Sequence, residues 1–133
     1  MTPAPDSERG EFTVSSDPAR LDFDLIHRYL STEAYWARGI ARDTLMRALA
    51  HSLCFGLYAG ERQAGFARVI TDTATYTYLD DVFALEPYRG RGLGGWLLDR
   101  ILAHPDLQGL RRFSLATSDA QVFYASHGWH PLR

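Results

Sequence analysis

Several stretches of the chain alternate apolar and polar positions or gather apolar ones, and these stretches predict β-strands. Residues 11–16, EFTVSS, alternate along their length. The apolar runs at 52–60 and 63–72 are joined by the polar turn AGER, which is typical of a β-hairpin. Residues 75–85, TYTYLDDVFAL, are rich in threonine, tyrosine and β-branched residues and predict the longest strand. Residues 111–117, RRFSLAT, predict one more strand.

Helices are predicted between these strands. Asp17 is expected to cap the first helix, with Pro18 in its first position, and this helix would run to about Leu30. A second helix is predicted at about 41–51. A third begins after the glycine-rich stretch, because apolar residues recur there every four positions, at Leu93, Leu97 and Ile101.

A capping-box pattern, Ser118 followed by Gln121, predicts a short last helix. The resulting order is β-α-α-β-β-β-α-β-α-β, with no repeats and no internal linker. We therefore expect one α/β domain with a mixed sheet over residues 11–133, preceded by a flexible arm at residues 1–10.

Composition narrows the class of protein. The chain has 133 residues, of which 46% are hydrophobic, enough for a core. A net charge of −2 gives no reason to expect nucleic acid or an anionic membrane as a partner. No run approaches the roughly 20 apolar residues of a membrane span and no signal peptide opens the chain, so a cytoplasmic protein is expected.

Metal and thiol chemistry are not expected. Cys54 is the only cysteine and lies in the apolar stretch SLCFGLY, which favours inert core packing over a reactive thiol. No pair of histidines with a carboxylate has convincing spacing for zinc, so we expect no metal.

The stretch EPYRGRGLGGWLLDRIL, residues 86–102, predicts a phosphate-binding turn. Its glycines allow close approach of the backbone, and the unpaired amides at a helix start favour an anion. Gly90, Gly92 and Gly95 also satisfy the dinucleotide pattern G-x-G-x-x-G. Only 38 residues follow Gly95, however, and the acidic residue expected about 20 positions later is missing. A glycine turn without a ligand is the remaining alternative.

The segment Arg89-Gly90-Arg91-Gly92-Leu93-Gly94 resembles the R/Q-x-x-G-x-G/A motif of the GCN5-related N-acetyltransferase (GNAT) family. FYASHGW, residues 123–129, resembles the family's FYxxxGF element. The resemblance covers roughly residues 11–130. It implies the acyl-CoA N-acyltransferase fold, a single mixed and mostly antiparallel sheet flanked by helices, and it implies acetyl-CoA as the co-substrate.

By this resemblance, the amides of the glycine turn wrap the pyrophosphate of acetyl-CoA, and residues 82–84 pair with its pantetheine arm. An amide near Ala84 would face the acetyl carbonyl oxygen. Thr117 lies where the family often has an asparagine. The full set of expected contacts is Val82, Phe83, Ala84, Arg89, Gly90, Arg91, Gly92, Leu93, Gly94, Gly95, Thr117 and Tyr124.

Tyr124 resembles the family tyrosine that protonates the departing thiolate, and a phenol with a pKa near 10 is protonated at neutral pH. The alternative is that Tyr124 only packs at a helix edge. For the base we prefer Asp81 to Asp80, since strand alternation places them on opposite faces and Asp81 shares a face with Phe83. A bulge would reverse this preference. The alternative for either carboxylate is a cap or a salt bridge.

By the same resemblance, Tyr35 and Trp36 would border the acceptor site together with Asp81, and the alternative is that the two rings simply pack. The sequence thus predicts an acetyl-CoA-dependent N-acetyltransferase that acts directly on a primary amine of a small molecule or protein. The alternatives are a non-catalytic acyl-CoA-binding module and an NAD(P)-dependent oxidoreductase. Family members usually continue past Trp129 with two more strands, whereas here only HPLR follows, so strand pairing into a homodimer is one expectation.

Overall fold

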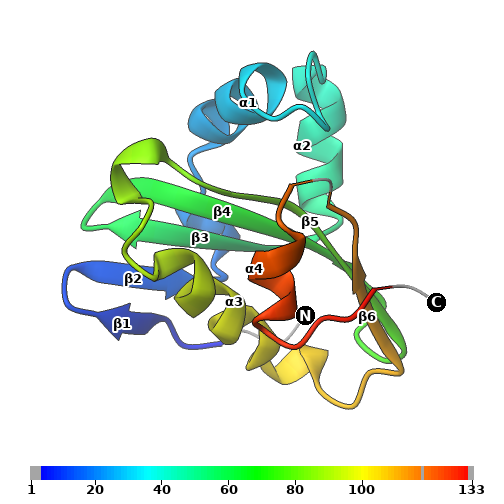
Figure 1. Ribbon diagram of the computed structural model, residues 1–133. Helices are drawn as coiled ribbons and strands as arrows, with labels where there is room; N and C mark the ends of the chain where they lie inside the picture. The colour runs from blue at the N-terminus through cyan, green and yellow to red at the C-terminus, as the bar shows by residue number, and fades with distance from the viewer. Residues whose placement is uncertain (1–3, 118, 132–133) are drawn as a thin grey trace.

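The computed structural model describes residues 4–117 and 119–131. These residues form a six-stranded sheet with the strand order β1-β2-β3-β4-β5-β6 (Figure 1). The strands are β1 (Ser7–Arg9), β2 (Phe12–Ser15), β3 (Leu53–Ala59), β4 (Arg62–Thr71), β5 (Tyr76–Ala84) and β6 (Arg112–Leu115). All neighbours are antiparallel except β5 and β6, which are parallel. The predicted single mixed, mostly antiparallel sheet is confirmed.

Helices cover both faces of this sheet (Figure 1). They are α1 (Phe23–Thr32), α2 (Arg42–Ala50), α3 (Leu93–Leu102) and α4 (Gln121–Ala125). Short 3-10 turns lie at Pro18–Arg20, Glu86–Tyr88 and Pro105–Leu107. No helix of the described residues is long and apolar enough to cross a membrane.

The core consists of two apolar clusters, one on each face of the sheet. Helix α3 packs its predicted stripe, Leu93, Leu97 and Ile101, into the first cluster. Helices α1 and α2 bury their apolar residues in the second cluster, together with Cys54 and Phe83 of the sheet. The sheet therefore lies between a layer of α1 and α2 and a layer that contains α3.

The N-terminal region differs from the prediction at two points. Residues 7–9, expected in a flexible arm, form β1 and pair with β2. Asp17 does cap a helical turn at Pro18, but that turn is a short 3-10 helix that ends at Arg20. Helix α1 begins only at Phe23, with the Asp22 side chain accepting from the Leu25 amide at 3.1 Å. The cause is Leu21, which takes an extended backbone and enters the core.

The C-terminal region is also shorter in regular structure than predicted. Helix α4 begins at Gln121 with Ala120 as its N-cap residue, and the predicted cap, Ser118, lies outside the described residues. Within residues 119–131 no strand follows α4, although the predicted order ends in one. The antiparallel sheet also disagrees with the dinucleotide alternative, since that fold is built on a mostly parallel sheet.

Candidate functional site

Strand β5 carries a bulge at Asp81. Phe66 pairs with Phe83 and Arg68 pairs with Asp80, so one intervening residue of β4 faces two of β5. Asp81 has a φ of 53°, which is uncommon for a residue other than glycine. A bulge re-aims the side chains that follow it, and such features are frequent next to active sites.

The bulge turns both adjacent carboxylates toward one guanidinium. Arg68 Nη2 lies 2.9 Å from Asp80 Oδ2, and Arg68 Nε lies 2.7 Å from Asp81 Oδ2. The predicted placement of Asp80 and Asp81 on opposite faces is therefore wrong. Strict alternation does not hold where the strand contains an extra residue.

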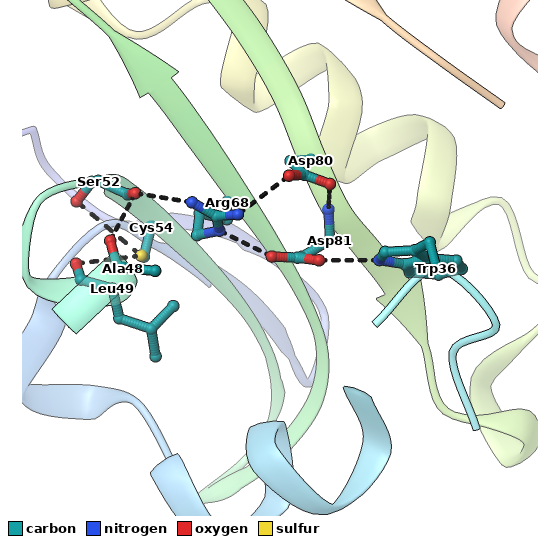
Figure 2. A network of polar contacts seen from close by, with 8 residues as sticks. All are labelled: Trp36, Ala48, Leu49, Ser52, Cys54, Arg68, Asp80 and Asp81. Atoms are coloured by element: carbon teal, nitrogen blue, oxygen red, sulfur yellow. Dashed lines mark hydrogen bonds and ion pairs between the residues drawn. The ribbon is translucent and has the colours of Figure 1, made fainter. Parts of the chain in front are cut away.

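Figure 2 shows the polar network around this pair. The Trp36 indole Nε1 donates to Asp81 Oδ1 at 2.8 Å, and the Asp81 amide donates to Asp80 Oδ1 at 2.8 Å. On its other side, Arg68 Nη1 donates to Ser52 Oγ at 3.3 Å. The network thus joins the loop between α1 and α2 to strands β4 and β5 and to the turn before β3.

Burial disfavours the charged form of Asp80 and raises its pKa, and the neighbouring Asp81 carboxylate acts in the same direction. The hydrogen bond from the Asp81 main-chain amide and, to a smaller extent, the Arg68 guanidinium lower the pKa of Asp80 and so oppose both effects. Cys54 is buried nearby, and burial raises the pKa of its thiol to about 12, which fits inert packing. Within residues 4–117 and 119–131 no cluster of potential ligands could hold a metal ion.

A cavity of about 410 Å³ opens beside these carboxylates, and we call it the aromatic cavity. Tyr35 and Trp36 line it from the loop after α1, and Tyr124 lines it from α4. Asp80, Asp81 and Asp119 also border it. The structure therefore brings the predicted acceptor residues together around one space whose charged lining is acidic.

A second cavity of about 350 Å³ lies between the end of β5 and the layer of α3 and α4, and we call it the channel. Arg89 and Gly94 line one part of it, and Tyr124 lines another. Its remaining walls are mainly apolar and include Val82, Phe83 and Ala84. Tyr124 and Val82 border both the channel and the aromatic cavity.

Strands β5 and β6 pair only from Tyr76 to Leu79 on the β5 side. One edge of β5 is paired with β4. Over residues 80–84 the opposite edge, which pairs with β6 earlier in the strand, has no strand partner among the described residues. Main-chain amides and carbonyls at such an edge can bind an extended, peptide-like ligand as an added strand. Thr117 stands beyond β6, where its hydroxyl accepts from the Ala120 amide at 3.1 Å.

The glycine turn leads into α3 as predicted. Gly90 and Gly92 have φ values of 76° and 75°, and a Cβ on either would meet no atom within 4 Å. Gly92 is the N-cap residue, it supplies no side-chain cap, and no acidic residue lies in the first turn. The first turn of α3 therefore has neither a side-chain cap nor a carboxylate that would compete for its first amides, which suits a diphosphate. Arg91 is exposed beside them.

The Arg89 side chain makes two hydrogen bonds within the protein, and its expected contact with acetyl-CoA stays a prediction. Its Nε donates to the Ala84 carbonyl at 2.9 Å, and its Nη2 donates to the Tyr29 hydroxyl at 3.0 Å. Tyr29 in turn stacks on Phe83 with 3.9 Å between the ring centroids. In this structure the Arg89 side chain thus connects the glycine turn to α1 and to the end of β5.

The Tyr124 phenol stays protonated at neutral pH. Burial raises its pKa above the ordinary tyrosine value, and the Asp119 carboxylate and Tyr35 act in the same direction. Its ring packs edge-on against Trp129, with 5.9 Å between the centroids. Tyr124 thus carries a protonated hydroxyl and lines both the channel and the aromatic cavity.

Arg68 is the residue of this site that sequence reasoning did not identify. The signal was present, because Arg68 interrupts an otherwise apolar stretch, FARVI, of a strand with buried neighbours on both sides. A charged residue at such a position is rarely buried without a partner. Sequence pattern alone does not indicate, however, which carboxylate the partner of Arg68 would be.

Known proteins share this architecture. The family model for the acetyltransferase (GNAT) domain matches residues 50–131. A curated protein of Gibberella zeae, provisionally named an acetyltransferase, is 38% identical over 90% of this chain and 78% of that protein. A crystal structure from Xanthomonas campestris pv. campestris, provisionally named a GNAT family acetyltransferase, matches with a TM-score of 0.89. It is 55% identical and covers 91% of this chain and 85% of that chain.

A more distant structure shares the fold alone. It is a GNAT family acetyltransferase from Elizabethkingia anophelis, solved with acetyl-CoA bound. The two chains match with a TM-score of 0.69 at 12% identity, over 94% of this chain and 80% of that chain.

Proposed function

The chain belongs to the GNAT acetyltransferase family, and from this premise we propose that it transfers an acetyl group from acetyl-CoA directly to a primary amine of a small molecule or protein. One observation carries the proposal. Tyr124 borders both the channel, which reaches the glycine turn, and the aromatic cavity, which contains the carboxylates. A proton donor between a cofactor channel and an acceptor cavity is the arrangement that such a transfer needs.

The chain's own groups fit acetyl-CoA. The amides from Gly90 to Gly95 would hold the pyrophosphate, aided by the positive end of the α3 dipole. The unpaired edge of β5 at Val82, Phe83 and Ala84 would pair with the pantetheine arm. The GNAT acetyltransferase from Elizabethkingia anophelis, which has the same fold, was solved with acetyl-CoA bound.

Acetyl-CoA, when bound, supplies the acetyl group as a thioester. A carboxylate of the Asp80–Asp81 pair, for which our sequence-based choice was Asp81, would accept the proton of the attacking amine. Amides near the end of β5 would stabilise the developing negative charge on the acetyl oxygen. Tyr124 would donate its proton to the departing thiolate, since its raised pKa keeps it protonated.

The aromatic cavity favours a cationic amine as the acceptor. Carboxylates border it, and the rings of Tyr35, Trp36 and Tyr124 offer faces for an apolar or cationic group. Its volume of about 410 Å³ suits a small amine or the side chain of a protein substrate.

The test combines binding with turnover. Thermal shift should show stabilisation by acetyl-CoA and CoA but not by NAD(P), and a panel of primary amines should release free thiol and yield acetylated product by mass spectrometry. Stabilisation by CoA without thiol release for any amine would instead support a non-catalytic acyl-CoA-binding module. Stabilisation by NAD(P) alone would support the oxidoreductase alternative.

The composition of the chain makes one part of this test unusually clean. All 14 lysine-plus-arginine positions of the sequence are arginine, so the chain has no lysine. Any acetyl-lysine formed on a lysine-containing peptide or protein therefore belongs to the acceptor and not to the enzyme. The expected cytoplasmic location and the expected homodimer remain predictions, and analytical ultracentrifugation checks the second.

A further inference from the structure

Arg68 contacts two of the carboxylates that border the aromatic cavity, and it is almost enclosed. Its side chain is 14% exposed, and the two carboxylates that it contacts differ in accessibility, with Asp80 at 29% and Asp81 at 6%. The guanidinium uses separate nitrogens for the two, Nη2 for Asp80 and Nε for Asp81. A planar guanidinium is suited to this bridging in a way that an ammonium group is not.

The count of charges explains why a cation is needed here. Two adjacent carboxylates in a partly buried site cannot both stay ionised easily, because each disfavours the charge of the other. Arg68 reduces the local charge of the pair from two negative charges to one. The other ionisable groups that line the cavity are Asp119 and the phenols of Tyr35, Tyr78 and Tyr124, none of which supplies a positive charge.

The two carboxylates are held in different ways. Both Asp81 oxygens accept from side chains, Oδ2 from Arg68 and Oδ1 from the Trp36 indole. Asp80 accepts from Arg68 at Oδ2 and from a main-chain amide at Oδ1, and it is the more exposed of the two. Asp81 is thus placed to anchor the Trp36 wall, while Asp80 is the carboxylate that an amine in the cavity can reach.

We propose that Arg68 is a positioning residue of the acceptor site, which keeps Asp80 ionised as the proton acceptor and keeps Asp81 in place as the anchor of Trp36. The proton that Asp80 accepts is defined by the proposed acetyl transfer, and to that extent the inference rests on the proposed function. The arrangement itself can be tested on the protein without any substrate.

The experiment is an NMR titration of the whole chain with Arg68→Met, Arg68→Lys and the control Arg62→Met, an exposed position on the same strand. Asp80→Asn and Trp36→Phe assign the carboxyl carbon and the indole NH signals. In Arg68→Met the titration midpoint of Asp80 should rise, since an opposite charge 2.9 Å from its carboxylate has been removed. Arg68→Lys should raise it less, because the charge remains.

The Trp36 indole signal reports the second role. It should move in both Arg68 variants, since neither side chain can hold Asp81 and Asp80 at once, and it should keep its position in Arg62→Met. If Arg68→Met does not fold, Arg68→Met combined with Asp80→Asn removes the repulsion and should restore the fold. An Asp80 midpoint and an indole signal that match wild type in the Arg68 variants would overturn the proposal, as would failure of the double variant to fold.

Turnover separates this proposal from the proposed function. With any amine that the wild type acetylates, the acidic limb of the kcat/KM profile should move to higher pH in Arg68→Met, together with the NMR midpoint. If the acidic limb of the kcat/KM profile lay at the same pH in Arg68→Met as in the wild type, the role of Asp80 as the proton acceptor would be contradicted. Absence of acetyl-CoA binding to the wild type by calorimetry would contradict the proposed function, and the titration result for Arg68 would stand separately.

Discussion

Arg89 Nε donates a 2.9 Å hydrogen bond to the backbone carbonyl oxygen of Ala84, which ties the glycine turn to the last residue of β5. The same side chain reaches the Tyr29 hydroxyl of α1. Arg89→Met should therefore lower the free energy of unfolding by about 1 kcal/mol, the usual net value of such hydrogen bonds. Arg91→Met, at an exposed position, should leave stability unchanged and should weaken acetyl-CoA binding mainly at low salt. Urea denaturation measures the stability of both variants, and calorimetry measures their affinity for acetyl-CoA. Equal stability of the two variants would show that the hydrogen bonds of Arg89 do not stabilise the fold.

Gly92 is expected to matter for both conformation and ligand binding. Its φ of 75° is left-handed, so Gly92→Ala should cost about 1 to 2 kcal/mol of stability. The added methyl would also stand in the open space before α3, and acetyl-CoA affinity should fall at least about tenfold, or 1.4 kcal/mol.

Gly109 offers a matched control, since its φ is 70° and it likewise has no atom within 4 Å of a built Cβ. Gly109→Ala should lose comparable stability but keep wild-type acetyl-CoA affinity by calorimetry. Equal losses of affinity in the two variants would show that the effect of Gly92→Ala comes from general destabilisation and not from the binding turn.

Features that depend on local sequence could be predicted. The stripe of Leu93, Leu97 and Ile101 is buried in α3, because four-residue spacing alone places these side chains on one face. The glycine turn could also be predicted from local sequence, because glycine has no Cβ and readily adopts the positive φ seen at Gly90 and Gly92. The sheet class followed from alternation together with the family resemblance.

Features that depend on partners distant in sequence could not be predicted. The bulge at Asp81 arises from the register of β5 against β4, and the sequence of β5 alone reads as regular alternation. Residues 7–9 are polar, and they form a strand only because their backbone pairs with that of β2. At the start of α1, Asp17 and Asp22 are both good caps, and burial of Leu21 between them decides where the α-helix begins.

Asp80→Asn should gain stability relative to wild type as the pH rises. Folding raises the pKa of Asp80, so the ionised carboxylate is less favourable in the folded protein than in the unfolded chain. The wild type therefore keeps its full stability at low pH and loses part of it as the pH rises through the folded-state pKa. Urea denaturation at intervals from about pH 4 to pH 7 measures the difference. If Asp80→Asn instead lost stability relative to wild type as the pH rose, the inferred direction of the pKa change would be wrong.

His104 should make the protein sensitive to acid. It is buried, its Nδ1 accepts from the Asp106 amide at 3.1 Å, and burial lowers its pKa. Because folding favours the neutral ring, His104 contributes to stability above the ordinary histidine pKa of about 6.5. This contribution is lost as the pH falls below that value and the ring has to take up a proton. His104→Asn should therefore show a flatter stability profile between about pH 8 and 5, whereas His51→Asn, at an exposed position, should follow the wild type.

Tyr124→Phe removes only the hydroxyl from the junction of the channel and the aromatic cavity. We expect kcat to fall by about a hundredfold, the lower range for loss of a positioned acid, and acetyl-CoA affinity to stay within about twofold. Because burial raises the pKa of Tyr124, the wild-type rate should show no basic limb from this group until above about pH 10. Tyr76→Phe, on an exposed part of β5, serves as the control and should retain the wild-type rate. Stopped-flow thiol release with the best amine of the panel measures kcat. Turnover equal to wild type in Tyr124→Phe would remove the acid role and leave the ring as a wall between the two cavities.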